Sequence, residues 1–274
     1  MWLAWDIAAG IGVALGVVAV AARRWRHRLA EVIRPWIWEL TLIFLLYALW
    51  QFGGRFNLMK PDGALAKGDA IWRLQRWLHL PSELSLQRAV LPHPLLVKAS
   101  NIYYAVAHVP ALIVFLIWLF AWHRERYPIV RTVLAFMTAV SLGLHLIPVA
   151  PPRMFPGLGF VDTALLYNQS VYGAAGAGVS DQLGAMPSLH VGWAVLVGFA
   201  AVWAGRSKWR WLALAHPLLT LLVVADTANH WWLDGVGAVL LIPPAWWLHR
   251  RAVAFIDRYR HAASDASREL ELTR

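Results

Sequence analysis

The segment "AMPSLHVGWA" sets a short polar group, Pro187, Ser188 and His190, at the start of an apolar run. Proline is favoured at the first position of a helix, so Pro187 predicts a helix start whose first N–H groups lack a helical partner. Such groups, with the positive end of the helix dipole, bind anions. We therefore expect the N–H groups of Ser188 and Leu189 to hold a phosphate beside His190, which exchanges protons near neutral pH. The simpler interpretation of this segment alone is a serine cap.

The segment "DTANHWWLDGVGAV" contains a second polar pair, His230 and Asp234, spaced four residues apart. On one helix these two side chains would lie on the same face. A carboxylate bonded to one imidazole nitrogen fixes the tautomer and makes the other nitrogen more nucleophilic. The alternatives are a buried ion pair between helices or a His/Asp metal pair. Two ligands do not complete a zinc site, so we expect no metal and no other cofactor.

A proline-rich segment, "HLIPVAPPRMFPGLGFVDT", supplies an arginine at the end of another apolar run. Its prolines should stop a helix, stiffen the chain and hold Arg153 near the membrane interface. The planar guanidinium of arginine suits phosphate. The alternative is an interfacial arginine that extends its charge toward water.

Further polar residues lie close to these three segments in the sequence. In "NIYYAVAHVP", Tyr104 and His108 follow Asn101 at helical spacing, and His108 would line a polar wall or bind an acceptor. Asn229 could donate to a phosphate. Lys98 and Arg55 are accessory cations for an anionic substrate.

The elements that must position these residues are apolar runs that approach the roughly 17 to 25 residues of a membrane-spanning helix. The chain has 274 residues, of which 59% are hydrophobic and 15% charged, and its mean hydropathy is +0.52. This composition indicates a polytopic, all-α membrane bundle of six to seven transmembrane helices with interfacial amphipathic helices. The expected spans are Trp2–Ala22, Trp36–Phe52, Ile102–Trp122, Thr132–Val149, Leu189–Ala204, Trp211–Val224 and Trp231–Leu248.

The distribution of arginine and lysine predicts the orientation of these spans. Basic residues cluster after the first, third, fifth and seventh runs, and such clusters mark the cytoplasmic side. Alternation then sends residues 53–101, residues 150–187 and the turn at Asn229 to the opposite side. All the polar segments described above meet there. We expect a multi-pass protein, of a bacterial plasma membrane, with its active site facing outward.

The remaining composition limits the partners and the domain plan. The net charge of +10 is spread among the spans, which favours anionic headgroups and argues against nucleic acid. A membrane lipid or lipid phosphate is the expected partner, and the sequence leaves the oligomeric state open. We expect one catalytic membrane domain over residues 1–250, with its motifs in about 100–250, and a cytoplasmic tail over 251–274.

One outer segment, "AIWRLQRWLHL", resembles a helix that lies in the headgroup layer. Its apolar residues Ile71, Leu74, Trp77 and Leu78 recur at helical spacing. Arg73, Gln75 and Arg76 are then predicted to face away from the apolar side. A solvated connector and a substrate-binding surface are equally compatible with this pattern.

The three motifs, "PVAPPR", "MPSLH" and "NHWWLD", occur in an order that resembles the type 2 phosphatidic acid phosphatase superfamily, in its inositol phosphorylceramide synthase-like branch. The resemblance covers about residues 100–250. It implies a metal-free phosphoryl transfer through a phosphohistidine. By this resemblance His230 is the nucleophile, Asp234 its orienting base and His190 the general acid. Arg153, Ser188 and Leu189 would hold the phosphoryl oxygens.

The sequence departs from the family's broad motifs at several positions. Leu146 stands where the first motif has lysine, Leu189 where the second has glycine, and Val224 where the third has arginine. Met154 replaces the proline after Arg153. The missing cations could be replaced by Arg55, Lys60 or Lys98, or by neutral donors such as Thr227 and Asn229. These differences favour the synthase-like branch over a plain phosphatase.

Two function classes follow from these observations. The first is a membrane phosphoesterase in which either water or an alcohol attacks the phosphohistidine, so that a phosphatase and a phosphotransferase are close alternatives. The second is a non-catalytic lipid transporter in which the same histidines and aspartate relay protons.

Overall fold

The computed structural model describes residues 3–24, 28–53, 63–170 and 182–272, and in this part of the chain the fold is all-helical. No strand forms there, only one isolated bridge between Val149 and Gly184. The expectation of an all-α fold is therefore confirmed for these residues. The α-helices are α1 (Trp5–Ala21), α2 (Arg28–Gly53), α3 (Ala64–Trp77), α4 (Glu83–Val90), α5 (Pro94–Val106), α6 (His108–Trp122), α7 (Tyr127–Leu144), α8 (Thr163–Leu166), α9 (Leu189–Ala204), α10 (Ala215–Asp226), α11 (Trp232–Val239) and α12 (Ile242–Leu272). Short 3-10 turns cover Ala22–Arg24, Pro152–Met154, Pro156–Leu158 and Lys208–Leu214.

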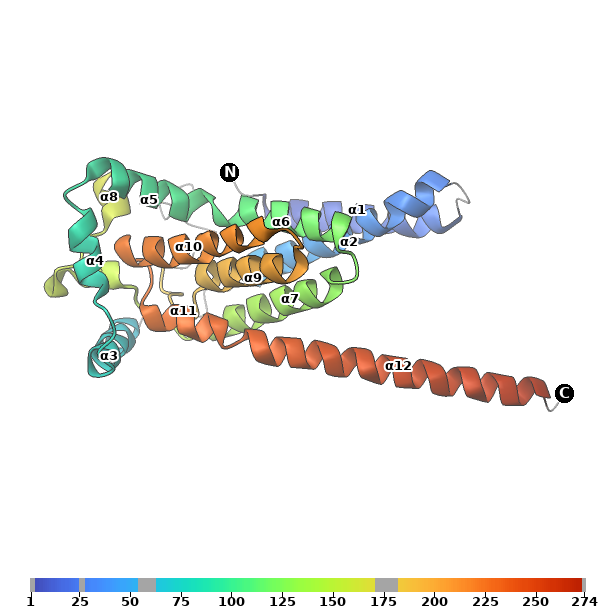
Figure 1. Cartoon of the computed structure of the whole chain (residues 1–274). Coiled ribbons are helices and arrows are strands. Elements are labelled where there is room, and N and C mark those ends of the chain that lie inside the picture. Colours follow the sequence, from blue (N-terminus) through green and yellow to red (C-terminus); the bar gives the residue numbers. More distant parts are fainter. Residues whose placement is uncertain (1–2, 25–27, 54–62, 171–181, 273–274) are drawn as a thin grey trace.

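Helix α9 is the centre of the bundle. It packs on α6, α7, α10 and α11 (Figure 1). The main apolar core joins α6, α7 and α9 with the start of α12 through fully buried side chains such as Leu119, Val133, Met137 and Ala204. Small residues allow this close approach: a Cβ at Gly192 would lie 2.6 Å from the Met137 side chain and 3.1 Å from Ala238. Burial of this core fixes the position at which the N-terminus of α9 meets the other motifs.

Three helices are long and apolar enough to cross a membrane, among the residues described: Trp5–Arg24, Leu29–Leu49 and Tyr127–Leu144. The pair α5 and α6, bent by 50° at Ala107, could form a fourth span. Several apolar helices thus agree with a membrane protein. The six to seven spans expected from the sequence stay a prediction, since α9, α10 and α11 have 16, 12 and 8 residues.

Three of the predicted spans are not single α-helices, and one of them, 211–224, begins in the 3-10 turn Lys208–Leu214 and continues in α10. The run 102–122 is broken between Val106 and His108, and the run 231–248 is broken between Val239 and Ile242. Helix α7 ends at Leu144, before the prolines of "IPVAPPR", because proline cannot continue the backbone hydrogen bonds of a helix. The break before His108 and the early end of α7 leave non-helical backbone next to residues of the polar motifs.

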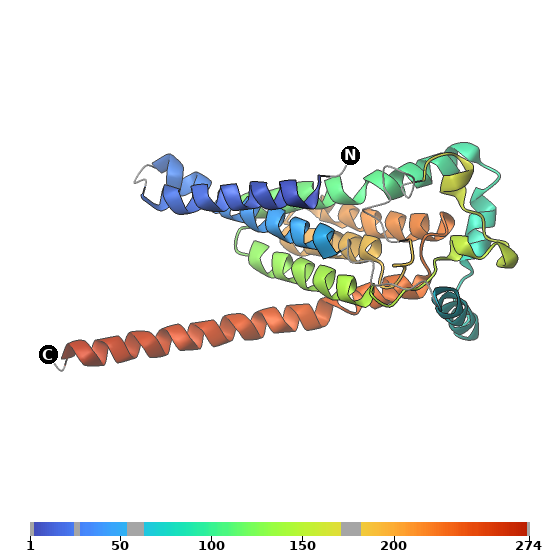
Figure 2. The same cartoon turned by 180° about the vertical axis from the view of Figure 1, so that it is seen from behind.

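One end of the bundle gathers segments that are far apart in the sequence. Helices α3, α4 and α8 lie there, whereas the C-terminal end of α1, the N-terminal end of α2 and the C-terminal end of α12 lie at the opposite end (Figures 1 and 2). Backbone hydrogen bonds join this end: Ala150 N donates to Ala64 O at 3.1 Å, and Arg153 N donates to Ala228 O at 2.9 Å. The predicted convergence of the polar segments therefore occurs at the α3–α4–α8 end.

The prediction for the segment 70–80 is wrong in one respect. Gln75 of α3 is fully buried, whereas Leu74, Trp77 and Leu78 are exposed, Trp77 by 73%. The apolar face of α3 thus points outward, where a bilayer interface would cover it, and the glutamine points into the protein. Arg73, paired with Asp69 at 2.9 Å, is exposed as expected.

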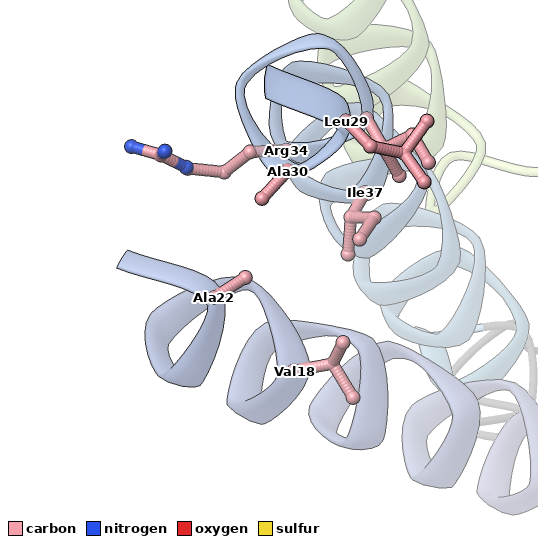
Figure 3. A pocket seen from close by; sticks show the side chains of 7 residues that line it. Val18, Ala22, Leu29, Ala30, Arg34 and Ile37 are labelled. Atoms are coloured by element: carbon pink, nitrogen blue, oxygen red, sulfur yellow. The ribbon is translucent and has the colours of Figure 1, made fainter. Parts of the chain in front are cut away.

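Helices α1 and α2 form an antiparallel pair, packed through Gly12 against Leu45 and through Gly16 against Thr41. Between them lies an apolar cavity of about 210 Å³. Figure 3 shows Val18, Ala22 and Ile37 at this gap, while the guanidinium of Arg34 extends away from them. Helix α12 leaves the bundle and runs through the predicted boundary at residue 250 without a break (Figure 1).

Candidate active site

His230 and Asp234 lie at the N-terminal end of α11, but not on one helix as expected. Helix α11 begins at Trp232 and Trp231 is its N-cap, so His230 belongs to the turn before it. The pair still meets: His230 Nδ1 is 3.5 Å from Asp234 Oδ2. The same carboxylate oxygen accepts the Trp231 N–H at 2.7 Å. Asp234 therefore both caps α11 and faces the imidazole.

The tautomer of His230 follows from a contact that the sequence does not show. His230 Nδ1 lies 2.8 Å from the carbonyl oxygen of Ala185. A carbonyl only accepts, so Nδ1 carries the hydrogen and Nε2 keeps its lone pair. The Ala185 carbonyl and Asp234 thus act together on Nδ1, and Nε2 is the nitrogen that can attack.

His190 faces that lone pair directly. Its Nδ1 is 3.4 Å from His230 Nε2, and because Nε2 is an acceptor, His190 Nδ1 is the donor. His190 sits in the first turn of α9, whose N-cap is Ser188. His230 is 5% exposed and His190 is half-buried, so His190 lies on the more accessible side of the pair. Two histidines that are 40 residues apart in the sequence thereby lie side by side.

Two aromatic side chains from the bend between α5 and α6 hold the His190 ring. Tyr104 stacks on it with ring centroids 4.4 Å apart, and His108 approaches it edge-on at 4.1 Å. Tyr104 also lies 6.3 Å from the His230 ring. The structure thus brings both predicted accessory residues to the histidine pair, since α5 bends into α6 at this level.

Ser188 is engaged differently from our expectation of free N–H groups at this helix start. Its N–H donates to the backbone oxygen of Asp234 at 2.9 Å, and its hydroxyl accepts the Val191 N–H at 3.4 Å. Pro187 lies before the N-cap instead of at the first helical position. Ser188 therefore ties the start of α9 to α11 and its N–H is not available to an anion. Leu189, the first residue of α9, follows it directly in the chain.

Arg153 is buried, not extended toward water. Its Nη1 donates to Asn229 Oδ1 at 2.8 Å and its Nε lies 3.5 Å from Asp162 Oδ2. Asn229 in turn donates to Thr227 Oγ1 at 2.9 Å. The guanidinium is thus fixed beside the residue that precedes His230. Asn229, expected to bind phosphate itself, positions the arginine.

Of the remaining predicted cations, Lys98 is described, and it lies away from this arrangement. Lys98 is exposed on α5, with its ammonium 5.2 Å from the centre of the Tyr167 ring. It belongs to the contact between α5 and residues 163–169, where its backbone oxygen accepts from Gln169. Arg55 and Lys60 fall outside the described residues.

The sequence reasoning missed three groups around the site. Asp162 contacts Arg153, and the Ala185 carbonyl contacts His230. Glu83 contacts the backbone of α11. Asp162 was present in the quoted segment "GLGFVDT", so its charge was a usable signal. The other two depend on long-range folding, because Ala185 is 45 residues from His230 and Glu83 is 149 residues from Trp232.

A model of the PAP2 superfamily matches residues 69–248, which is well over half of the chain and includes the motifs described above. The chain belongs to the PAP2 superfamily. Among the curated proteins and the solved structures that were compared, none matches the chain. Membership of this superfamily indicates a phosphatase-type enzyme, and the apolar helices indicate a membrane protein. The resemblance inferred from the motifs is thus confirmed for the superfamily.

Proposed function

We propose that this protein is a membrane phosphoesterase or phosphotransferase that acts on a lipid-linked phosphate through a phosphohistidine on His230. The observation that carries the proposal is the pair His230 Nε2 and His190 Nδ1, 3.4 Å apart, with His230 Nδ1 held by a carbonyl. An unprotonated imidazole nitrogen beside a proton donor is what nucleophilic attack on phosphorus requires.

The reaction has two steps. First, His190 starts as the imidazolium; His230 Nε2 forms a bond to phosphorus while the bond from phosphorus to the leaving oxygen breaks, and His190 gives its Nδ1 proton to that oxygen and becomes neutral. Second, water or an alcohol attacks phosphorus, its proton passes to His190, and the bond from Nε2 to phosphorus breaks. Asp234 stabilises the positive charge that develops on the imidazole ring.

Arg153, which is bonded to the residue before His230, is the cation that we assign to the phosphoryl oxygens. Its guanidinium is held by Asn229 and Asp162. The side chain therefore loses less conformational entropy when it binds a phosphate. The helix starts supply less than expected, because Ser188 N–H already has a partner. We infer that Arg153 carries the phosphate-binding role that the family's other cations would share.

The acceptor decides between a phosphatase and a phosphotransferase of the inositol phosphorylceramide synthase-like branch. The departures at Leu146, Leu189 and Val224 support the transferase. The gathering of the site at the end bearing α3, α4 and α8, together with the arginine distribution, supports an outward-facing site.

Trapping tests the phosphohistidine. Purified protein in detergent is mixed with ³²P-labelled dioctanoyl phosphatidic acid, quenched with base and assayed for acid-labile, base-stable label. We expect label on the wild type and none on His230→Ala. Equal labelling of the alanine variant would refute the assignment of the nucleophile.

Release of phosphate tests the acceptor in the same preparation. A phosphatase releases inorganic phosphate from dioctanoyl phosphatidic acid without an added alcohol. For a phosphotransferase we expect slow release of inorganic phosphate without an alcohol. When myo-inositol is added, the label should instead appear in a phosphoester of myo-inositol. Fast release that myo-inositol leaves unchanged would contradict the transferase.

A further inference from the structure

Three polar side chains from α3 and α4 are completely buried against the segment that carries His230. They are Gln75, Glu83 and Gln87, each with no exposed surface, and we call them the polar clamp. Burying polar groups is costly unless each finds a partner. Three of their hydrogen bonds go to backbone atoms of residues 226–233, so the clamp holds both ends of the turn between α10 and α11.

The contacts are specific to the first turn of α11. Glu83 Oε1 accepts the Trp232 N–H at 3.0 Å, and Gln75 Oε1 accepts the Leu233 N–H at 3.0 Å. Gln75 Nε2 donates to Glu83 Oε1 at 2.7 Å, which locks the two side chains together. The first N–H groups of a helix have no partner within it, so the clamp caps α11 from outside while Asp234 caps it from within.

The other end of the turn is held in the same way. Gln87 Nε2 donates to Asp226 O at 3.1 Å and to Val161 O at 2.9 Å, and its Oε1 accepts the Val161 N–H at 2.9 Å. His230 therefore lies between two anchored points of backbone, four residues after Asp226 and two before Trp232. A small rotation of the first turn of α11 would change its contacts with Asp234 and His190.

We propose that Gln75 and Glu83 are positioning residues of the enzyme, which set the orientation of His230 through the first turn of α11. The inference rests on the proposed function, since it assigns a role relative to the nucleophile. By this inference α3 and α4 position the active site and are more than a connector on the bilayer. Their oxygens accept the backbone N–H groups of Trp232 and Leu233, and through these bonds they act on the turn that carries His230.

Two substitutions of Glu83 separate positioning from charge. Glu83→Leu removes the acceptor of the Trp232 N–H, and Glu83→Gln keeps an acceptor oxygen without the charge. For Glu83→Leu we expect kcat to fall about tenfold to a hundredfold, with KM changed less than about twofold, because misplacement of a reacting group slows chemistry more than binding. Glu83→Gln should retain kcat within about threefold.

The assay uses the full chain in detergent with dioctanoyl phosphatidic acid, and thermal melting of each variant reports folding. Asp69→Leu is the matched control. Asp69 is an acid of α3 whose ion pair is with the exposed Arg73, at 2.9 Å, and not with the backbone of α11. It should keep wild-type kcat. A rapid-quench measurement of His230 phosphorylation should show the same loss for Glu83→Leu, since the first chemical step is affected.

Gln75→Met provides a milder test if Glu83→Leu does not fold. It removes the acceptor of the Leu233 N–H and should also lower kcat with little change in KM. If Glu83→Leu or Gln75→Met folds and keeps wild-type kcat, the inference is wrong. It is also wrong if neither of these two variants folds while Glu83→Gln has normal activity, because the two side chains would then serve folding alone. Activity that survives His230→Ala would refute the proposed function instead, so the two failures are distinguishable.

Discussion

Replacement of Asp234 by asparagine tests how much the buried carboxylate contributes to turnover. Asparagine keeps an oxygen that can accept the Trp231 N–H, now bonded at 2.7 Å, so the cap of α11 should survive. What is lost is the negative charge 3.5 Å from His230 Nδ1. That charge is fully buried and stabilises the imidazole only when it becomes positive, which happens as phosphorus bonds to Nε2.

The magnitude follows from Coulomb's law. Two unit charges at 3.5 Å attract by about 5 kcal/mol at an effective dielectric constant of about 20, and by about 1 kcal/mol in water. Since the positive charge is only partly developed and is shared over the ring, we take about 3 to 4 kcal/mol. Each 1.4 kcal/mol is about tenfold, so kcat should fall about a hundredfold to a thousandfold.

The assay measures kcat and KM with dioctanoyl phosphatidic acid, together with the melting temperature in detergent. We expect KM to stay within about threefold, because the charge acts on the transition state. Asp69→Asn, an exposed acid on α3, is the matched control and should behave as wild type. A kcat within threefold of wild type would refute the electrostatic reasoning. Failure to fold would favour a structural ion pair.

Three more predictions concern other parts of the site. His190→Ala should slow turnover of dioctanoyl phosphatidic acid about 100- to 10,000-fold but slow p-nitrophenyl phosphate much less, because nitrophenolate leaves without a proton; equal losses would contradict the general acid. Gly68→Ala should lower the melting temperature through a loss of about 1 to 3 kcal/mol, since the new Cβ would lie 2.6 Å from the Ala150 carbonyl oxygen, whereas Gly143→Ala, with no atom within 4 Å, should not; equal melting temperatures would count against tight packing of α3. Burial raises the pKa of Glu83 in the folded protein. The protonated side chain therefore contributes to the free energy of unfolding at pH values below the ordinary pKa of glutamate, and this contribution is lost as the pH rises through the raised pKa. Glu83→Gln should therefore gain stability relative to wild type as pH rises, and thermal melting across about pH 4 to 8 checks this; a parallel pH profile would contradict it.

Much of the chemistry could be predicted because it depends on short segments. The order of "PVAPPR", "MPSLH" and "NHWWLD" sufficed to indicate the superfamily, and the spacing of His230 and Asp234 sufficed to predict their contact. Ser188 was a recognisable cap, because serine before an apolar run satisfies an N–H group of the first turn. The all-helical fold followed from long apolar runs interrupted by proline and basic residues.

The interruptions inside those runs were not predictable from hydropathy. A hydropathy average runs across both breaks, whereas Pro110, which follows the first, and Pro243 and Pro244, which follow the second, favour an interruption of the helix there. Gln75 was misassigned for a related reason. Periodicity identifies the apolar face of α3, but in a membrane protein that face can point toward lipid while a polar residue points inward.

The sequence alone thus determined which residue types meet and the reaction class that they can support. The tertiary structure decided how each one acts: Ala185 sets the tautomer of His230, Asn229 and Asp162 hold Arg153, and Glu83 and Gln75 cap α11. These partners lie up to 158 residues apart in the chain. Their contacts involve backbone atoms or buried polar groups, whose pairing is set by the packed fold and not by any local pattern.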